Sequence, residues 1–419
     1  MLDRLSAVAI WVLFSFGLSL GLTLLCERLA RRIGLVALPR EDRWHGAPVP
    51  LLGGVAIVVG TLVPLAVSTA GTRDFLVLGL AALGMAAVGL VDDIYSLKPQ
   101  LKLIAQIVIA TALLYSGFLL RLSPSPLLNI FLTLLWIVGI TNAFNLLDNM
   151  DGLAAGVAAI AAGSSLLLSL WELDSNGALA AAIFLGACLG FLPRNFPPAR
   201  IFMGDAGSYF LGVFLAGLSL IAQFPYSRGI TAVLALPVLI LLVPIFDTAF
   251  VTITRLFSGR PLAVGGRDHT SHRLVSVGVS ERWAVVFFYG ITASSGILAI
   301  LSYQVGFSYS VVLLSLLVLV VVLLGVYLAG VRQVTVAPAS RPGAVLHLVA
   351  DFPYKRQVLT VALDLVLIVL AYYTAYLLRF EQGMASEVKR FFESLPLVLV
   401  SQLIALVATG LYRGVWRYV

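Results

Sequence analysis

Charged side chains are scarce in this chain. Of its 419 residues only 11% are Asp, Glu, Lys or Arg, whereas 60% are hydrophobic and the mean hydropathy is +1.04. An ordinary soluble domain has a lower apolar share, roughly 45–50%. The composition therefore excludes such a domain and predicts that lipid is the solvent for most of the chain.

Cysteine and histidine are also rare, with two and four residues respectively. Cys26 and Cys188 stand in or beside apolar runs and have neither metal-ligand nor redox spacing, so we predict small core residues. His269 and His272 lie together in a basic loop, but no cysteine or acidic pattern completes a zinc site there. The loop is better suited to binding an anion, and His45, in another basic loop, extends the same expectation.

Long apolar runs are abundant. A helix needs about 20 apolar residues to cross a bilayer, whereas a β-barrel would show short alternating segments. We predict an all-α polytopic membrane bundle of about 13 transmembrane helices, about 11 in a core and 2 near the C-terminus. The predicted spans are 8–30, 51–70, 74–91, 102–120, 127–147, 152–171, 177–193, 206–224, 229–254, 283–303, 308–331, 357–378 and 394–411.

The distribution of basic residues predicts an orientation, because cytoplasmic loops carry an excess of Lys and Arg. With the N-terminus outside, most of the 27 Lys and Arg residues fall on the cytoplasmic face, and the C-terminus is cytoplasmic as well. We therefore expect a multi-pass protein of the inner (plasma) membrane.

Carboxylates and amides recur in three short clusters at the ends of apolar runs, all on the predicted cytoplasmic face. The clusters are VDDIYSLK (91–98), NAFNLLDNMDG (142–152) and FMGDAGS (202–208). Ionisable groups at the edge of hydrocarbon are expensive to place there. Their recurrence at matched depth predicts a site.

The first cluster contains adjacent carboxylates, Asp92 and Asp93, at the end of a predicted helix. The helix dipole is negative there and the two carboxylates repel each other, so a cationic partner is expected. Lys98, Lys102 or a divalent ion could serve, and Mg²⁺ commonly takes one or two carboxylates plus substrate phosphates. The alternative is a pair that only caps the helix end and meets water.

The second cluster places Asn142, Asn145, Asp148 and Asp151 three residues apart. This spacing predicts a polar stripe around one side of a helix end, although such amides can also hold membrane helices together. In the third cluster we expect Asp205 to cap the helix that follows. That helix would present its positive dipole end to phosphate oxygens, and capping alone is the alternative role.

Together the clusters offer carboxylates for a metal, helix N-termini and basic side chains for phosphates, and amides for a polar headgroup. This layout suits two substrates, one soluble and phosphorylated and one borne by lipid. Phosphoryl transfer between them requires mainly positioning and charge neutralisation.

Five segments resemble one family in order along residues 1–332. They are PREDRWHGAPVPLLGG, VDDIYSLKPQLKLIAQ, NAFNLLDNMDGL, FMGDAGS and HTSHRL. The family is the polyprenyl-phosphate N-acetylhexosamine-1-phosphate transferases, glycosyl transferase family 4. The resemblance implies transfer of a sugar-1-phosphate from a UDP-sugar to undecaprenyl phosphate or a similar polyprenyl phosphate, with release of UMP, at the start of cell-envelope glycan synthesis. It also implies Mg²⁺, with Mn²⁺ as the alternative, and a homodimer; nucleic acid is not an expected partner.

The resemblance also implies roles for individual residues. Asp92, Asp93 and Asp205 match the catalytic carboxylates, with Asp205 and Asp92 as metal ligands. The substrate-binding residues implied or expected are Lys102, Asn145, Asp148, Asp151, Phe202, His269, His272, Arg273 and His45. Asp247 is either a further member of this site or a buried residue with a hydrogen-bonded partner.

Some positions depart from the family pattern. HTSH stands where phospho-MurNAc-pentapeptide transferases carry a run of three histidines, and Asn149 replaces a common glycine. The N-acetylhexosamine branch is therefore expected, with the phospho-MurNAc-pentapeptide transferase as an alternative. A transporter or flippase is a further alternative, but it should place charges near mid-membrane and use broken helices. A non-catalytic anchor for a glycan-assembly complex would not explain the acidic clusters.

The chain is expected to divide into a transferase domain (1–332), a cytoplasmic linker (333–356) and a two-helix extension (357–419). The extension resembles the membrane anchor of polysaccharide-biosynthesis nucleotide-sugar dehydratases and epimerases. No GxGxxG motif follows it, so that second activity is not expected here.

Overall fold

The computed structural model describes most of the chain. The described residues are 2–37, 48–68, 72–221, 236–259, 266, 268–305, 355–379 and 384–408, with scattered helical positions between 317 and 328. His45 lies outside them. Contacts group the chain into a first unit (Met1–Val251, Gly265–Ile300, Val331–Val336) and a second unit (Thr252–Val264, Leu301–Gly330, Ala337–Val419). The domain boundaries drawn from the sequence stay a prediction.

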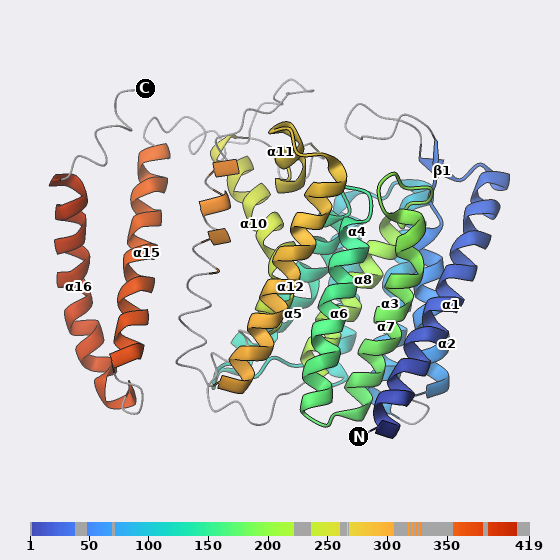
Figure 1. Ribbon diagram of the computed structural model, residues 1–419, viewed down its shortest axis with the longest axis horizontal. Helices are drawn as coiled ribbons and strands as arrows, with labels where there is room; N and C mark the ends of the chain where they lie inside the picture. The colour runs from blue at the N-terminus through green and yellow to red at the C-terminus, as the bar shows by residue number, and fades with distance from the viewer. Residues whose placement is uncertain are drawn as a thin grey trace. The chain divides into compact units, whose positions relative to one another are not determined.

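Helices run side by side through the first unit (Figure 1), with β1 and α11 at one end and the N-terminus at the other. In chain order its elements are α1 (Leu2–Ile33), β1 (Val36–Ala37), β2 (Val49–Pro50), α2 (Gly53–Ser68), α3 (Arg73–Tyr95), α4 (Pro99–Tyr115), α5 (Pro126–Leu147), α6 (Leu153–Trp171), α7 (Ser175–Asn195), α8 (Gly204–Ile221), α10 (Leu242–Phe257, shared with the second unit), α11 (Thr270–Ser276) and α12 (Glu281–Val305).

Seven of the helices in the described part of the chain are long and apolar enough to cross a membrane: α1, α3, α5, α6, α7, α8 and α12. Helices α2 and α4 are apolar but shorter. The predicted all-α, multi-pass membrane bundle is therefore confirmed in this general form. The number of about 13 spans and the outside-to-cytoplasmic orientation stay predictions.

Helix α8 is the most enclosed of these helices, since almost every side chain along it is buried. It packs against α3, α5 and α2. Glycines permit this approach: a side chain on Gly54 of α2 would collide with the backbone of Gly207, and one on Gly89 of α3 with the backbone of Asp205. Small residues let membrane helices approach closely, and here they fix the start of α8 against two neighbours.

A short antiparallel pairing joins β1 to β2, with Val36 opposite Pro50. The chain before α8 continues this arrangement: Phe202 N–H donates to the Pro50 carbonyl at 2.8 Å, and Gly53 N–H donates to the Phe202 carbonyl at 2.9 Å. These two strands, each two residues long, were not expected from the sequence. Through these hydrogen bonds, β2 and the start of α2 fix the position of Phe202, just before α8.

In the second unit, α15 (Lys355–Arg379) packs against α16 (Met384–Ala408). Tyr372 stacks on Phe391 with ring centroids 5.3 Å apart, and its hydroxyl lies 2.7 Å from Ser394 Oγ. Helix α16 begins ahead of the expected start at residue 394. The resemblance of this pair to a membrane anchor stays a prediction.

Candidate active site

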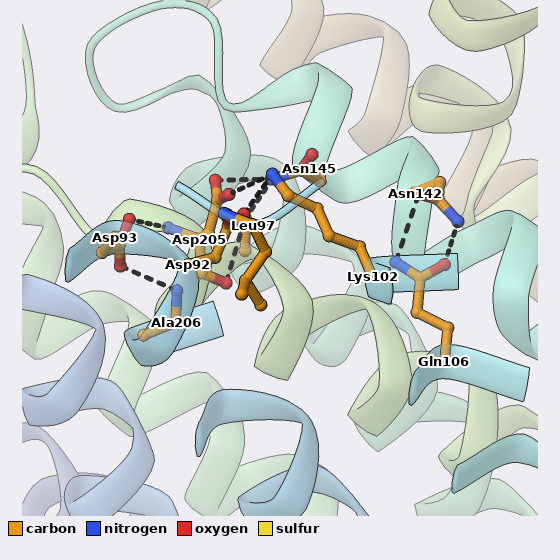
Figure 2. A network of polar contacts seen from close by, with 10 residues as sticks. Asp92, Asp93, Leu97, Lys102, Gln106, Asn142, Asn145, Asp205 and Ala206 are labelled. Atoms are coloured by element: carbon orange, nitrogen blue, oxygen red, sulfur yellow. Dashed lines mark hydrogen bonds and ion pairs between the residues drawn. The ribbon is translucent and has the colours of Figure 1, made fainter. Parts of the chain in front are cut away.

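Three carboxylates from two helices meet where α3 ends and α8 begins. Asp92 and Asp93 stand in the last turn of α3, and Asp205 stands in the first turn of α8. One lysine contacts the carboxyl groups of both Asp92 and Asp205, and the Asp93 carboxylate accepts a hydrogen bond from the backbone of Asp205. The first and third acidic clusters of the sequence therefore form one cluster in space (Figure 2).

Lys102 supplies the positive charge beside this cluster. Its ammonium forms an ion pair with Asp92 and lies 3.5 Å from Asp205 Oδ2. Asp92 Oδ1 accepts a hydrogen bond of 2.7 Å from the backbone of Leu97, in the turn between α3 and α4. The expectation that a lysine compensates the carboxylate pair is confirmed for Lys102.

Asp93 holds the N-terminus of α8. The backbone N–H groups of Asp205 and Ala206 donate to its two carboxylate oxygens at 2.8 and 3.1 Å. The expectation that Asp205 caps this helix is wrong, because Asp205 lies within the first turn and its side chain turns toward Lys102. Gly204 has φ +68° and faces Asp93 so closely that a Cβ would collide with the carboxylate. A glycine is required there.

Amide side chains connect α4 and α5 to the same cluster. Asn145 Nδ2 donates to Asp205 Oδ1 at 2.9 Å and to Ser208 Oγ at 3.0 Å. Gln106, one turn after Lys102 in α4, and Asn142, one turn before Asn145 in α5, exchange two amide hydrogen bonds of 3.2 and 2.6 Å (Figure 2). This reciprocal pair fixes α4 against α5, so that Lys102 and Asn145 reach Asp205 together.

The predicted polar stripe is only partly helical. Helix α5 ends at Leu147, and Asp148 is its C-cap residue. Asp151 therefore stands in a turn, where its Oδ2 accepts a 2.7 Å hydrogen bond from Ala199 N–H. Helix α5 ends at the same residue as the predicted span 127–147, and Gly152, with φ +73°, redirects the chain into α6.

Asn195, at the end of α7, was not anticipated from the sequence. It is buried, its Oδ1 accepts from Gly152 N–H at 3.0 Å, and its Nδ2 donates to the Ile201 carbonyl at 2.9 Å. One amide thus joins the turn after α5 to the segment before α8. No spacing pattern in the sequence marks a single asparagine of this kind.

A cavity of about 270 Å³ opens beside the carboxylate cluster. Its lining is mostly polar and comes from loops and helix ends of the first unit: Leu51, Asp93, Asn145, Leu146, Asp148, Asn149, Met150, Asp151, Asn195, Phe202, Gly204, Asp205, Gly266, His269, His272 and Glu281. Most of the site residues expected from the sequence are in this set. Asp92 and Lys102 stand behind it, and Glu281 was missed because it begins a helix that carried no motif.

Arg273 does not line the cavity, in contrast to the two histidines of its segment. It is buried, its guanidinium lies 4.9 Å from the centre of the Phe250 ring, and Nε donates to the Asp268 carbonyl at 3.2 Å. These contacts favour a packing role for Arg273 over the phosphate contact expected of it.

Asp247 of α10 anchors the segment that carries the histidines. Its Oδ2 lies 2.7 Å from His269 Nδ1, and its Oδ1 accepts from the backbone and hydroxyl of Thr270 at 2.8 and 2.6 Å. Of the two roles considered for Asp247, burial with hydrogen-bonded partners is the one observed. Ser271 then donates to Asn149 Oδ1 at 2.6 Å and ties the same segment to the turn after α5.

The carboxylate cluster has an excess of negative charge. When ionised, Asp92, Asp93 and Asp205 carry three negative charges against one on Lys102, a difference of two. Among the residues that the structure describes, no three His, Cys, Asp or Glu side chains are arranged as a metal cage. Mg²⁺ does not need such a cage, since it takes one or two carboxylates together with water and substrate phosphates. The residues present fit that mode of binding.

Comparison with known proteins agrees with this geometry. The family model described as glycosyl transferase family 4 matches residues 75–223, a range that includes the carboxylate cluster. A Bacillus subtilis protein named "probable undecaprenyl-phosphate N-acetylglucosaminyl 1-phosphate transferase" is 34% identical over 311 residues, which cover 69% of this chain and 83% of that protein. The chain belongs to glycosyl transferase family 4.

Two other relatives show the breadth of this similarity. A Mycolicibacterium smegmatis protein named decaprenyl-phosphate N-acetylglucosaminephosphotransferase is 35% identical over 298 residues, 62% of this chain and 73% of that protein. A Synechococcus protein named phospho-N-acetylmuramoyl-pentapeptide-transferase is 30% identical over 326 residues, 69% of this chain and 93% of that protein.

Proposed function

We propose that this protein transfers N-acetylhexosamine-1-phosphate from a UDP-sugar to undecaprenyl phosphate or a similar polyprenyl phosphate and releases UMP. The observation that carries the proposal is the convergence of Asp92, Asp93, Asp205 and Lys102 beside a polar cavity at the end of a membrane bundle. The names of the Bacillus and Mycolicibacterium relatives support the same reaction.

In the net reaction, the bond between the sugar-bearing phosphorus and the oxygen shared with uridylate breaks. A bond between that phosphorus and an oxygen of the lipid phosphate forms, and UMP leaves with the shared oxygen. Asp205 and Asp92 would hold Mg²⁺, which neutralises charge on the diphosphate when bound. Asp92 is the candidate activator of the lipid phosphate, and Lys102 keeps its carboxylate in place.

The cavity offers distinct surroundings to the two ends of the donor. Asp148, Asp151 and Phe202 lie on its wall and are proposed to bind the nucleotide, with the Phe202 ring stacking on uracil. His269 and His272, whose ring centroids are 6.0 Å apart, are proposed to contact phosphate oxygens. Asn145 supports this arrangement by fixing Asp205. The site is proposed to face the cytoplasm across the inner membrane, in a homodimer.

A phospho-MurNAc-pentapeptide transferase is the second candidate, since a relative of that name is 30% identical. Against it stands the histidine segment: His269 and His272 are separated by Thr270 and Ser271, and both intervening side chains are engaged, by Asp247 and Asn149 respectively. The N-acetylhexosamine reaction is therefore the better supported of the two.

The test is a turnover assay with purified protein, undecaprenyl phosphate, Mg²⁺ and a panel that includes UDP-N-acetylglucosamine and UDP-MurNAc-pentapeptide. We expect UMP release together with a lipid-linked sugar diphosphate from a UDP-N-acetylhexosamine, and neither product without the lipid phosphate. An Asp205→Asn preparation controls for contaminating hydrolases. Absence of UMP with every donor would contradict the proposal and favour transport or scaffolding, and turnover only of the pentapeptide donor would favour the second candidate.

A further inference from the structure

Asp247 is a buried carboxylate outside the Asp92, Asp93 and Asp205 cluster. Its side chain is 1% exposed, and all its contacts named above go to two consecutive residues, His269 and Thr270. A buried charge is costly unless it is paired and hydrogen-bonded. Here the donors that satisfy it come from the one segment that presents histidines to the cavity.

The contact with Asp247 assigns the two nitrogens of His269 different roles. Nδ1 lies 2.7 Å from Asp247 Oδ2, so it carries the proton of this hydrogen bond. His269 also lines the cavity, and Nε2, on the other edge of the ring, is the nitrogen left to meet a ligand there. The partner of one ring nitrogen sets which form the other takes.

The backbone around His269 is held on two sides. Thr270 donates its N–H and its hydroxyl to Asp247 Oδ1, which fixes the residue next to the histidine. Ser271 donates to Asn149, whose own Nδ2 donates to the Leu146 carbonyl at the end of α5. Rotation of the ring would therefore break its contact with Asp247 of α10, and a shift of the backbone would also disturb the contact of Ser271 with Asn149 in the turn after α5.

We propose that Asp247 is a positioning residue of the transferase: it holds the Nδ1 proton of His269 and so presents Nε2–H of the imidazolium to a phosphate oxygen of the substrates. A phosphate oxygen requires a donor, and the imidazolium has two, one for Asp247 and one for the ligand. This inference rests on the proposed function.

A double-mutant cycle tests whether Asp247 acts through His269. We expect Asp247→Asn to lower kcat/KM about 10- to 100-fold, and to have almost no further effect when His269→Gln is already present. Thr270→Val is the matched control, because it removes one donor to Asp247 but leaves the ring contact; we expect a much smaller loss. If Asp247→Asn lowers turnover by the same factor in both backgrounds, its role is structural and the proposal is wrong.

A spectroscopic test does not depend on turnover. The chain has only four histidines, so ¹⁵N-histidine labelling gives four pairs of ring-nitrogen signals, and His269→Gln assigns the pair of interest. At alkaline pH, neutral His269 should carry its proton on Nδ1 in the wild type and on Nε2 in Asp247→Ala. The same tautomer in both proteins would overturn the proposal.

If Asp247→Ala does not fold, the test uses the wild type and Thr270→Val. We expect the Nδ1–H form of His269 in both, and an Nε2–H form in the wild type would overturn the proposal. An inactive wild type with the expected tautomers would contradict only the proposed function.

Discussion

The carboxylates at two places in this molecule are neutralised in different ways. At the junction of α3 and α8, Asp92 and Asp205 share one lysine. In α10, the single carboxylate of Asp247 is matched by three donors from adjacent residues. The first group is short of positive charge and lies beside the cavity, whereas the second is satisfied. We infer that the first is suited to bind a cation and that the second holds another residue in place.

The largest effect is expected at Asp205, where the charge imbalance is greatest. Asp205→Asn keeps the size and the contact with Asn145 but removes a carboxylate next to Asp92. We expect UMP release to fall at least about 100- to 1,000-fold, the scale of losing a key electrostatic group, and added Mg²⁺ not to restore it. Near-normal turnover would remove Asp205 from the metal site.

Lys102→Met removes the positive charge beside the carboxylate cluster. The Asp92 side chain is 2% exposed and would lose its ion-pair partner, so we expect a loss of about 3–5 kcal/mol in the free energy of unfolding as well as low turnover. Thermal unfolding in detergent measures the first effect. The double variant Asp92→Asn with Lys102→Met should recover most of the stability but none of the turnover. Failure to recover stability would mean that Lys102 acts on something besides Asp92.

Asp93 is expected to affect stability through the cap of α8, in addition to its place in the carboxylate cluster. Asp93→Ala removes both acceptors for the first N–H groups of α8, and loss of a helix cap costs about 0.5–2 kcal/mol. Asp74→Ala is the control for removing one carboxylate, because Asp74 is exposed in the first turn of α3, the helix that also carries Asp93. Equal melting temperatures for Asp93→Ala and the wild type would show that the cap adds little.

The smallest effect is expected from the Gln106 and Asn142 pair. Gln106→Ala leaves the amide of Asn142 without its reciprocal partner, and side-chain hydrogen bonds between membrane helices contribute about 0.6–2 kcal/mol. We expect a lower melting temperature and a higher KM, since Lys102 and Asn145 lose their fixed spacing. Thr111→Val, on the exposed face of α4, should change neither. An unchanged KM in Gln106→Ala would separate this pair from the site.

The sequence predicted much of this arrangement from simple physical arguments. Apolar runs predicted the membrane helices, and the expense of charges at the edge of hydrocarbon predicted that the three polar clusters meet. The need to compensate Asp92 and Asp93 predicted a cationic partner, and Lys102, one of the three candidates, forms an ion pair with Asp92. These inferences depend on the local sequence or on the cost of an uncompensated charge, which is the same in any fold.

Other features depend on contacts that no local pattern specifies. The cap of α8 comes from Asp93, 112 residues before the first amide that it accepts, whereas a local pattern favoured Asp205. Asn195 and Glu281 stand alone in the sequence without a repeating neighbour. Their roles depend on which helix ends pack together. Glycines such as Gly89 control this packing, because they let the backbones of two helices approach closely.

The buried amide of Asn195 has a consequence for any attempt to alter the specificity of the cavity for its proposed donor. Asn195 forms hydrogen bonds with both Gly152 and Ile201, so it joins the backbone next to Asp151 to the backbone next to Phe202. Variants that change the shape of either backbone segment will disturb the other. Libraries for a new preference should therefore vary a half-buried lining side chain such as Glu281 and leave Asn195 and Asn149 untouched.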